Sequence, residues 1–534
     1  MLATPWNQRK NSYDVVVIGS GYGGAISAAR LASAQLNPKP SVCILERGKE
    51  WEPGHFPEDV PGILGAARSD LNPLGLFEFL NYQDISVIKG SGLGGTSLIN
   101  ANVAIRPNRE VFEQFHWPTA ISFDELSDHY DTAQAMLGAG PHPRALDLPK
   151  VKALQTRAAQ LGGNAEALNI AVNFTIDGNN PHGVEQHPCN DCGNCVSGCN
   201  VRAKNTLQMN YLPMAKNAGA TILTQATVEY LEKLPGGGWR IHGQHVENLL
   251  VKERFQIDAN EIILSAGSLN STEILLRSEM RGLSVSPALG TKFNGNGDFF
   301  GLAYNGAPET DVLGYRYKQK PGPGDSAAPG PNIVGIVRYN GALPQAQRIA
   351  IEDFSFPVAY VDAAKLLFAS LRGQDTVAGD EDAQRARMQR DLEPFHRRYD
   401  PEGAMNHTML YLVMGMDDAR GTVQFEAPWN EPDGRIRVAW DQAGQQQIFT
   451  RMNDELRRHA RALHANFIAN PTWSVFNLRH LVTAHPLGGC PMGDDYLQGA
   501  VDAFGRVFSG DGSVHPGLYV TDGSVIPSAL GVNP

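Results

Sequence analysis

Four of the six cysteines in this 534-residue chain lie within eleven residues, close enough in sequence to act together as ligands or to form disulfides. Residues 188–200 read PCNDCGNCVSGCN, so the thiols follow the spacing C-x2-C-x2-C-x3-C. Loops with this spacing wrap iron–sulfur clusters, because successive thiolates converge on one small volume. The spacing therefore predicts one iron–sulfur cluster, held by Cys189, Cys192, Cys195 and Cys199.

Three other interpretations of the cysteine loop stay open. A tetrahedral zinc site also accepts four thiolates, although zinc loops usually space their ligand pairs further apart. Two tight disulfides would suit an oxidised, secreted domain. Alternatively, the thiols stay reduced in a loop that is structural or vestigial.

A nucleotide-binding unit is predicted near the N-terminus. Residues 13–18, YDVVVI, form the apolar, β-branched run of a buried parallel strand. The glycines of a G-x-G-x-x-G pattern follow directly: Gly19, Gly21 and Gly24. A helix over residues 25–35 and a second strand that ends at Glu46 complete the unit. The acid would accept hydrogen bonds from a ribose, and a pyrophosphate would lie at the helix N-terminus, as in FAD or NAD sites.

A second glycine-rich loop occupies residues 90–106, GSGLGGTSLINANVAIR. It is too rich in glycine for a helix interior and too far along the chain to belong to the first unit. A large ligand that needs two close backbone approaches would explain both loops. An NAD-linked dehydrogenase that uses only the first motif remains an alternative, but it leaves this loop unexplained.

Together with two later segments, these loops resemble the glucose–methanol–choline (GMC) flavoprotein oxidoreductases. Residues 261–277, EIILSAGSLNSTEILLR, are similar to the family segment that closes the nucleotide-binding fold. Residues 485–534 contain HPLGGCPMG, GRV and GLYVTDGSVIPSALGVNP, which most closely resemble the cholesterol-oxidase branch. The resemblance implies an α/β fold, in which a Rossmann-like FAD-binding domain is joined to a second, mixed α+β substrate-binding domain.

The resemblance also implies how the chain is divided. The discontinuous FAD-binding domain would comprise residues 12–110, 200–300 and 471–534. The substrate-binding domain, which would carry the cysteine-rich loop 189–199, would comprise residues 111–199 and 301–470. Beyond the first glycine motif and Glu46, the resemblance implies further FAD contacts at Gly90, Gly94, Gly95, Thr96, Asn100, Val228, Asp522 and Gly523.

Enzymes of this family oxidise an alcohol: a base takes the hydroxyl proton while hydride passes to the flavin. The resemblance implies that His485 is the base and that Asn533 orients the substrate oxygen. An imidazole suits a base that must be largely neutral near pH 7. The cholesterol-oxidase branch adds a carboxylate from a strand that lines the substrate cavity. Glu352, in RIAIEDFSFP, is the candidate for it, and Asp353 is the alternate.

Composition narrows the expected partners. The net charge is −11 and the pI is about 5.8, which argues against a nucleic-acid or anionic-membrane partner. No apolar run reaches transmembrane length, and the N-terminus lacks the apolar stretch of a secretion signal. These features favour a cytoplasmic protein with reduced thiols, which weakens the disulfide interpretation.

The combined expectation is an FAD-dependent enzyme that oxidises the CH–OH group of an apolar, sterol-like alcohol. A cluster beside the flavin would divide the electron pair for a one-electron acceptor protein, so it favours a dehydrogenase. One alternative is an alcohol or sterol oxidase that uses oxygen and has no cluster. Another is a flavin-binding electron-transfer module without catalytic activity.

Overall fold

The apolar run YDVVVI forms β1 (Ser12–Ile18), whose side chains alternate between two buried clusters. Val15 and Val17 pack in one cluster, and Val16 and Ile18 pack in the other. The strand pairs in parallel with both of its neighbours, β2 and β13. Because both faces of the sheet are covered here, the last four residues of the strand, 15–18, are all apolar and buried, as predicted, whereas Ser12 and Asp14 at its start are exposed.

The computed structural model describes residues 1–341, 343–371, 373–377, 379–392, 399–428 and 434–534. Its eight-stranded sheet has the order β10-β2-β1-β13-β12-β11, and β24 and β23 extend it beside β13. The five strands β10, β2, β1, β13 and β24 run parallel, whereas β11 and β12 form an antiparallel extension. The strand bounds are β2 (Val42–Leu45), β10 (Thr221–Leu223), β11 (Ala226–Lys233), β12 (Trp239–Val246), β13 (Lys252–Leu264), β23 (Arg506–Phe508) and β24 (Val514–Val520).

Helices cover both faces of this sheet. On one face lie α1 (Tyr22–Ala32) and α6 (Tyr211–Asn217), and on the other lies α7 (Ser268–Glu279). Helix α1 begins three residues before its predicted start, because Gly21 is its N-cap and the next two glycines lie in its first turn. Its buried side is made of alanine and glycine, which lets the helix approach the sheet closely.

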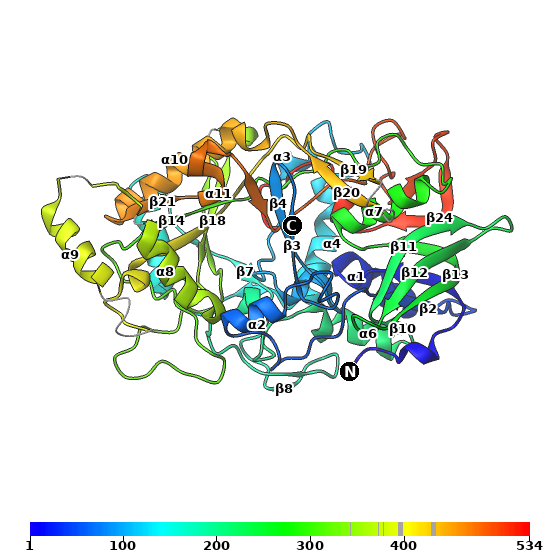
Figure 1. Ribbon diagram of the computed structural model, residues 1–534, viewed down its shortest axis with the longest axis horizontal. Coiled ribbons are helices and arrows are strands. Elements are labelled where there is room, and N and C mark those ends of the chain that lie inside the picture. Colours follow the sequence, from blue (N-terminus) through cyan, green and yellow to red (C-terminus); the bar gives the residue numbers. More distant parts are fainter. Residues whose placement is uncertain (342, 372, 378, 393–398, 429–433) are drawn as a thin grey trace.

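A second, seven-stranded sheet is antiparallel, with the order β17-β21-β14-β18-β16-β15-β6. Helices α5 (Pro149–Ala159) and α10 (Gln447–Ala462) pack together on one face of it. The two large sheets lie at opposite ends of the long axis (Figure 1). This arrangement confirms the prediction of an α/β nucleotide-binding domain with a second, mixed domain. The strand bounds are β6 (Glu166–Ala167), β14 (Phe299–Tyr304), β15 (Gly335–Tyr339), β16 (Ile349–Phe354), β17 (Gln374–Asp375), β18 (Met409–Gly415) and β21 (Asn466–Ala469).

A three-stranded sheet lies between the two large ones (Figure 1). It has the order β22-β4-β3, formed by β22 (Leu481–Thr483), β4 (Ile85–Gly90) and β3 (Phe77–Asn81). Strands β22 and β4 are parallel, and Thr483 is paired with Val87. Carboxyl ends of parallel strands meet at the same edge of a sheet. The second glycine loop and His485 therefore leave this sheet on the same side.

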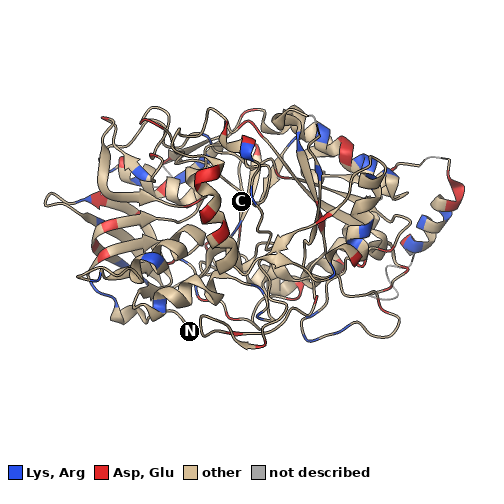
Figure 2. Ribbon diagram, turned by 180° about the vertical axis from the view of Figure 1, so that it is seen from behind, with Lys and Arg blue, Asp and Glu red and all other residues tan. Residues whose placement is uncertain are grey.

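The remaining elements are shorter or more exposed. In Figure 2, α9 carries charges of both signs and projects from one end of the molecule. Among the described residues, no helix is both long and apolar enough to cross a membrane. The bounds are α2 (Val60–Gly65), α3 (Arg109–Phe112), α4 (Phe123–Met136), α8 (Val361–Leu371), α9 (Glu381–Leu392), α11 (Pro471–Ser474), β5 (Gly140–Pro141), β7 (Asn169–Ile170), β8 (Gly178–Asn179), β9 (Glu185–Gln186), β19 (Thr422–Glu426) and β20 (Arg435–Ala439).

Candidate active site

The three glycines of the first motif have different tasks. A Cβ at Gly19 would lie 2.2 Å from the backbone oxygen of Ser265, and one at Gly24 would lie 2.1 Å from the oxygen of Gly19. These two positions therefore need glycine for packing. A Cβ at Gly21 would meet no atom of the described residues within 4 Å. Gly21 caps α1, so the open space lies at a helix N-terminus, where backbone N–H groups favour a phosphate.

Glu46 follows β2 and connects the two glycine loops through Ser20. Its carboxylate accepts hydrogen bonds from Ser20 N at 3.2 Å, Ser20 Oγ at 2.5 Å and Gly48 N at 2.7 Å. Ser20 Oγ in turn accepts a hydrogen bond from Gly94 N at 2.9 Å. Ser20 lies inside the first motif but was not predicted as a site residue.

The second glycine loop touches the first. Gly94 and Gly95 adopt positive φ angles of 105° and 57°. A Cβ at Gly95 would lie only 3.0 Å from Gly21 Cα, so a side chain there would press against the first loop. Asn100 donates a hydrogen bond from Nδ2 to the Tyr22 hydroxyl at 2.8 Å, and its N–H donates to Thr96 O at 2.9 Å. Gly90 is the last residue of β4 and starts this loop.

Asp522 and Gly523 connect the C-terminal segment to the start of α7 and to the segment that carries His485. Asp522 accepts hydrogen bonds from Gly267 N at 2.8 Å and from Ser271 Oγ at 2.5 Å, so it fixes the start of α7. Gly523 O accepts from Gly488 N at 3.0 Å, which ties this turn to the segment that carries His485. Val228 lies near Glu46 as well. The backbone oxygen of Glu46 accepts a hydrogen bond from the N–H of Ala226, which is two residues before Val228 in β11.

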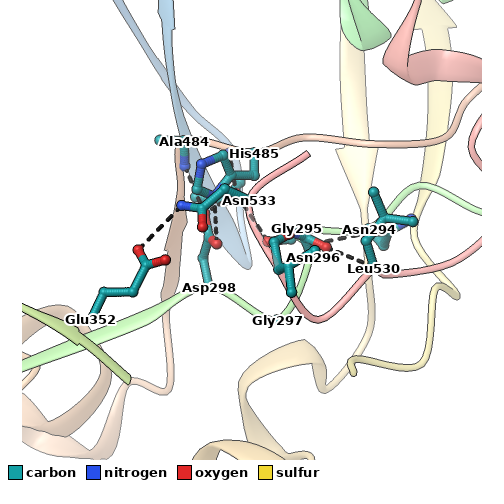
Figure 3. Close-up of polar contacts among 12 residues, drawn as sticks. Asn294, Gly295, Asn296, Gly297, Asp298, Glu352, Ala484, His485, Leu530 and Asn533 are labelled. Atoms are coloured by element: carbon teal, nitrogen blue, oxygen red, sulfur yellow. Dashed lines mark hydrogen bonds and ion pairs between the residues drawn. The ribbon is translucent and has the colours of Figure 1, made fainter. Parts of the chain in front are cut away.

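Glu352 and Asn533 form a buried polar pair beside His485 (Figure 3). Asn533 Nδ2 donates to Glu352 Oε2 at 3.3 Å, and both side chains are buried. Burial is the main cause that raises the pKa of Glu352 to about 8. Among the described residues, Glu352 Oε1 and Asn533 Oδ1 are buried without a hydrogen-bond partner. Two such atoms at one place are suited to a ligand that carries a hydroxyl group.

The alternation of β16 decides between the two candidate acids. Asp353 forms an ion pair with Lys150 of α5 at 2.8 Å, and both side chains are completely buried. Successive side chains of a strand point to opposite faces. Asp353 therefore points to the face that α5 covers, whereas Glu352 points to the opposite face, where it contacts Asn533. The geometry therefore favours Glu352 over Asp353 as the site carboxylate, and that role stays a prediction.

Asp298 is a site residue that the sequence analysis missed. Its Oδ1 lies 2.8 Å from His485 Nδ1, and its Oδ2 accepts from Ala484 N at 3.0 Å. The acid follows the polar segment NGNG at 294–297 and directly precedes β14. The feature that could have identified Asp298 from the sequence is its place as a single acid between a glycine and an apolar strand. Nothing in the spacing pointed to His485 as its partner.

The cysteine loop lies beside the second glycine loop. Lys204 donates from Nζ to Asn100 O at 2.6 Å and to Cys195 O at 3.1 Å, which joins the two loops. Burial raises the pKa of Cys189 and of Cys192 well above the ordinary value, which favours their neutral thiols. Within the described ranges, no three Cys, His, Asp or Glu side chains could together hold a metal ion. The iron–sulfur cluster stays a prediction from the spacing alone.

Comparison with known protein families gives two matches that cover most of the chain. Residues 13–294 match the N-terminal part of the GMC oxidoreductases, and residues 417–534 match the C-terminal part. Two solved structures share the fold over nearly the whole chain. Pyridoxine 4-oxidase from Mesorbium loti has a TM-score of 0.59 at 15% identity and covers 97% of this chain and 95% of its own. A fungal aryl-alcohol oxidase has a TM-score of 0.58 at 15% identity, with coverage of 98% and 96%.

Curated relatives are similar over nearly the whole of this chain as well. A cholesterol oxidase of Mycobacterium tuberculosis is 27% identical over 558 residues, which cover 98% of this chain and 89% of that protein. A cholesterol oxidase of Acinetobacter baumannii is 24% identical, with coverage of 98% and 91%. A long-chain-alcohol oxidase of Arabidopsis thaliana is 25% identical, with coverage of 98% and 65%.

Proposed function

The chain belongs to the GMC oxidoreductase family, and from this premise we propose that it is an oxidase of apolar alcohols, of the sterol or long-chain type, with oxygen as electron acceptor. As a member of this family it is an FAD-dependent enzyme that acts on CH–OH donors. The observation that carries the proposal is the buried Glu352–Asn533 pair beside His485, in which two oxygens have no hydrogen-bond partner among the described residues. The names of the cholesterol and long-chain-alcohol oxidases support the apolar substrate.

FAD fits the residues that the glycine loops bring together. The open space at Gly21 lies where the motif would hold the pyrophosphate, and Ser91 Oγ in the second loop is buried without a partner among the described residues. Glu46, Ser20 and Asn100 would add polar contacts around it. When bound, FAD supplies the acceptor for the hydride that leaves the carbinol carbon.

The side chains of the site divide the remaining work. His485 Nε2 has no hydrogen-bond partner in the part of the chain that the structure describes, so it is free to accept the hydroxyl proton. Asn533 offers an amide that orients the substrate oxygen without titrating. Glu352, with a pKa of about 8, holds its proton near pH 7 and avoids a buried charge.

Oxygen consumption with a series of alcohols tests this function. Cholesterol and 1-dodecanol should bleach the flavin of the anaerobic holoenzyme, and ethanol should do so far more slowly. On admission of air, one H2O2 should form for each alcohol converted to its carbonyl. Reduced flavin that reacts only with a one-electron acceptor would make the protein a dehydrogenase and revive the cluster. Flavin that no alcohol bleaches would overturn the proposal and leave a flavin-binding module.

FAD retention should depend on Glu46. Glu46→Ala removes the acceptor for the ribose and leaves Ser20 N and Gly48 N without their carboxylate. Hydrogen bonds to a charged group contribute about 1.5–3 kcal/mol, so the FAD dissociation constant should rise about 10- to 150-fold. Ultrafiltration of diluted holoprotein, followed by flavin fluorescence of the filtrate, measures this loss. Glu52→Ala, at an exposed acid nearby, is the control, and equal retention in both variants would count against the placement of FAD.

A further inference from the structure

Residues 294–298 contact both His485 and the chain next to Asn533, and the family resemblance assigned no role to them. We propose that Asp298 is a positioning residue for the reaction, which holds His485 in the tautomer that leaves the Nε2 lone pair free for the substrate hydroxyl. The proposal rests on the proposed function, because it names the group that prepares the base of that same site.

The contacts of Asp298 determine which nitrogen of His485 carries the proton. A carboxylate offers only acceptors, so the ring nitrogen at 2.8 Å from Oδ1, which is Nδ1, must donate. A neutral imidazole that is protonated on Nδ1 has its lone pair on Nε2. The same carboxylate also stabilises the imidazolium that forms when Nε2 takes up a proton.

Both oxygens of Asp298 are held, so the carboxylate cannot turn away from the ring. Oδ2 accepts from Ala484 N at 3.0 Å and from Thr483 Oγ1 at 2.8 Å, and the residue is 5% exposed. The N–H of His485 donates to Thr483 Oγ1 at 2.8 Å. The N–H of Ala484 and the imidazole of His485 therefore both bind the carboxylate of Asp298. This double attachment fixes both the position and the rotation of the ring.

The same stretch also fixes the chain beside Asn533. Asn296 donates from Nδ2 to Val532 O at 2.7 Å and accepts from Leu530 N at 2.7 Å (Figure 3). Asn296 has a positive φ of 56°, which is uncommon outside glycine. Asp417 stabilises this turn, because its Oδ2 accepts from Gly295 N and Gly297 N at 3.0 and 2.8 Å. One short segment thus sets the spacing between the base and the orienting amide.

Asp298→Asn tests whether Asp298 controls the tautomer of His485 or only fills space beside it. Asparagine has nearly the same size, and its oxygen can still accept from Ala484 N. Its amide would then face Nδ1 as a donor and would favour the opposite tautomer, with a proton on Nε2. The rate of flavin reduction by saturating alcohol should fall about 100-fold, while substrate affinity and FAD content should stay within about twofold. Asp177→Asn, which removes an exposed acid 2.7 Å from His187 Nδ1, is the matched control and should keep the full rate.

Nitrogen NMR of histidine-labelled protein reads the tautomer without any turnover. The His485 signals are identified by their loss in His485→Gln. In the parent protein Nδ1 should resonate as a protonated nitrogen and Nε2 as an unprotonated one, and Asp298→Asn should exchange them. A parent protein with its proton on Nε2 overturns the inference even if the variant does not fold.

The two proposals fail in different ways. If no alcohol bleaches the parent holoenzyme, the proposed function fails, and the NMR experiment still tests Asp298. If the parent oxidises alcohols and Asp298→Asn keeps both its rate and its Nδ1–H tautomer, only the inference on Asp298 is overturned.

Discussion

Replacing His485 with glutamine is expected to slow flavin reduction by an alcohol by about 10²- to 10⁴-fold. Removal of hydride from a carbinol carbon leaves a carbonyl only if the hydroxyl proton also departs. Glutamine can still contact Asp298, but its amide cannot take up that proton near pH 7. Anaerobic stopped-flow absorbance at the flavin band, with saturating substrate, measures the rate.

His480→Gln is the control for this substitution. His480 lies five residues earlier on the same segment, where its ring contacts Ser86 Oγ at 2.8 Å and takes no part in the site. This variant should reduce its flavin at the parent rate. A nearly unchanged rate in His485→Gln itself would move the base elsewhere, and Glu352 would be the first residue to test.

Glu352→Gln should change how stability depends on pH. Burial raises the pKa of Glu352 from 4.5 to about 8 in the folded protein. Between these values the folded carboxyl keeps its proton and the unfolded one loses it. Folding therefore takes up a proton, and the free energy of unfolding falls as pH rises from 4.5 to 8. A pKa difference of one corresponds to about 1.36 kcal/mol, so the free energy of unfolding should fall by about 5 kcal/mol over this range.

A glutamine has no such proton to lose, and its oxygen still accepts the hydrogen bond from Asn533. The variant should therefore be more stable than the parent at pH 8, and the difference should shrink towards pH 4.5. Urea unfolding at pH 5, 6.5 and 8 measures it. The difference between variant and parent cancels other buried acids, such as Asp417, whose pKa burial raises to about 7. Glu381→Gln, at an exposed acid on α9, should match the parent at every pH, and a parallel profile for Glu352→Gln would contradict the buried, protonated carboxyl.

Local patterns allowed much of the nucleotide-binding domain to be predicted. The run YDVVVI, the glycine pattern and the acid at Glu46 lie within 34 residues, and each depends on rules that act over a few neighbours. The strand, turn and helix were therefore correct, with helix α1 shifted because its glycine cap was not recognised as the start. The different tasks of Gly19 and Gly21 were not predictable, since they depend on Ser265 and on open space, both set by packing.

The sequence by itself determined the fold class, the flavin-binding family and the short set of side chains suited to chemistry. Only the tertiary structure decided which of them meet. It turned Glu352 towards Asn533 and Asp353 towards Lys150, because the pleat of β16 sends neighbours to opposite faces. It placed Asp298 beside His485, 187 residues away along the chain. Contacts over such a separation follow from how the sheets and helices pack against one another, and no spacing within a short window of sequence records them.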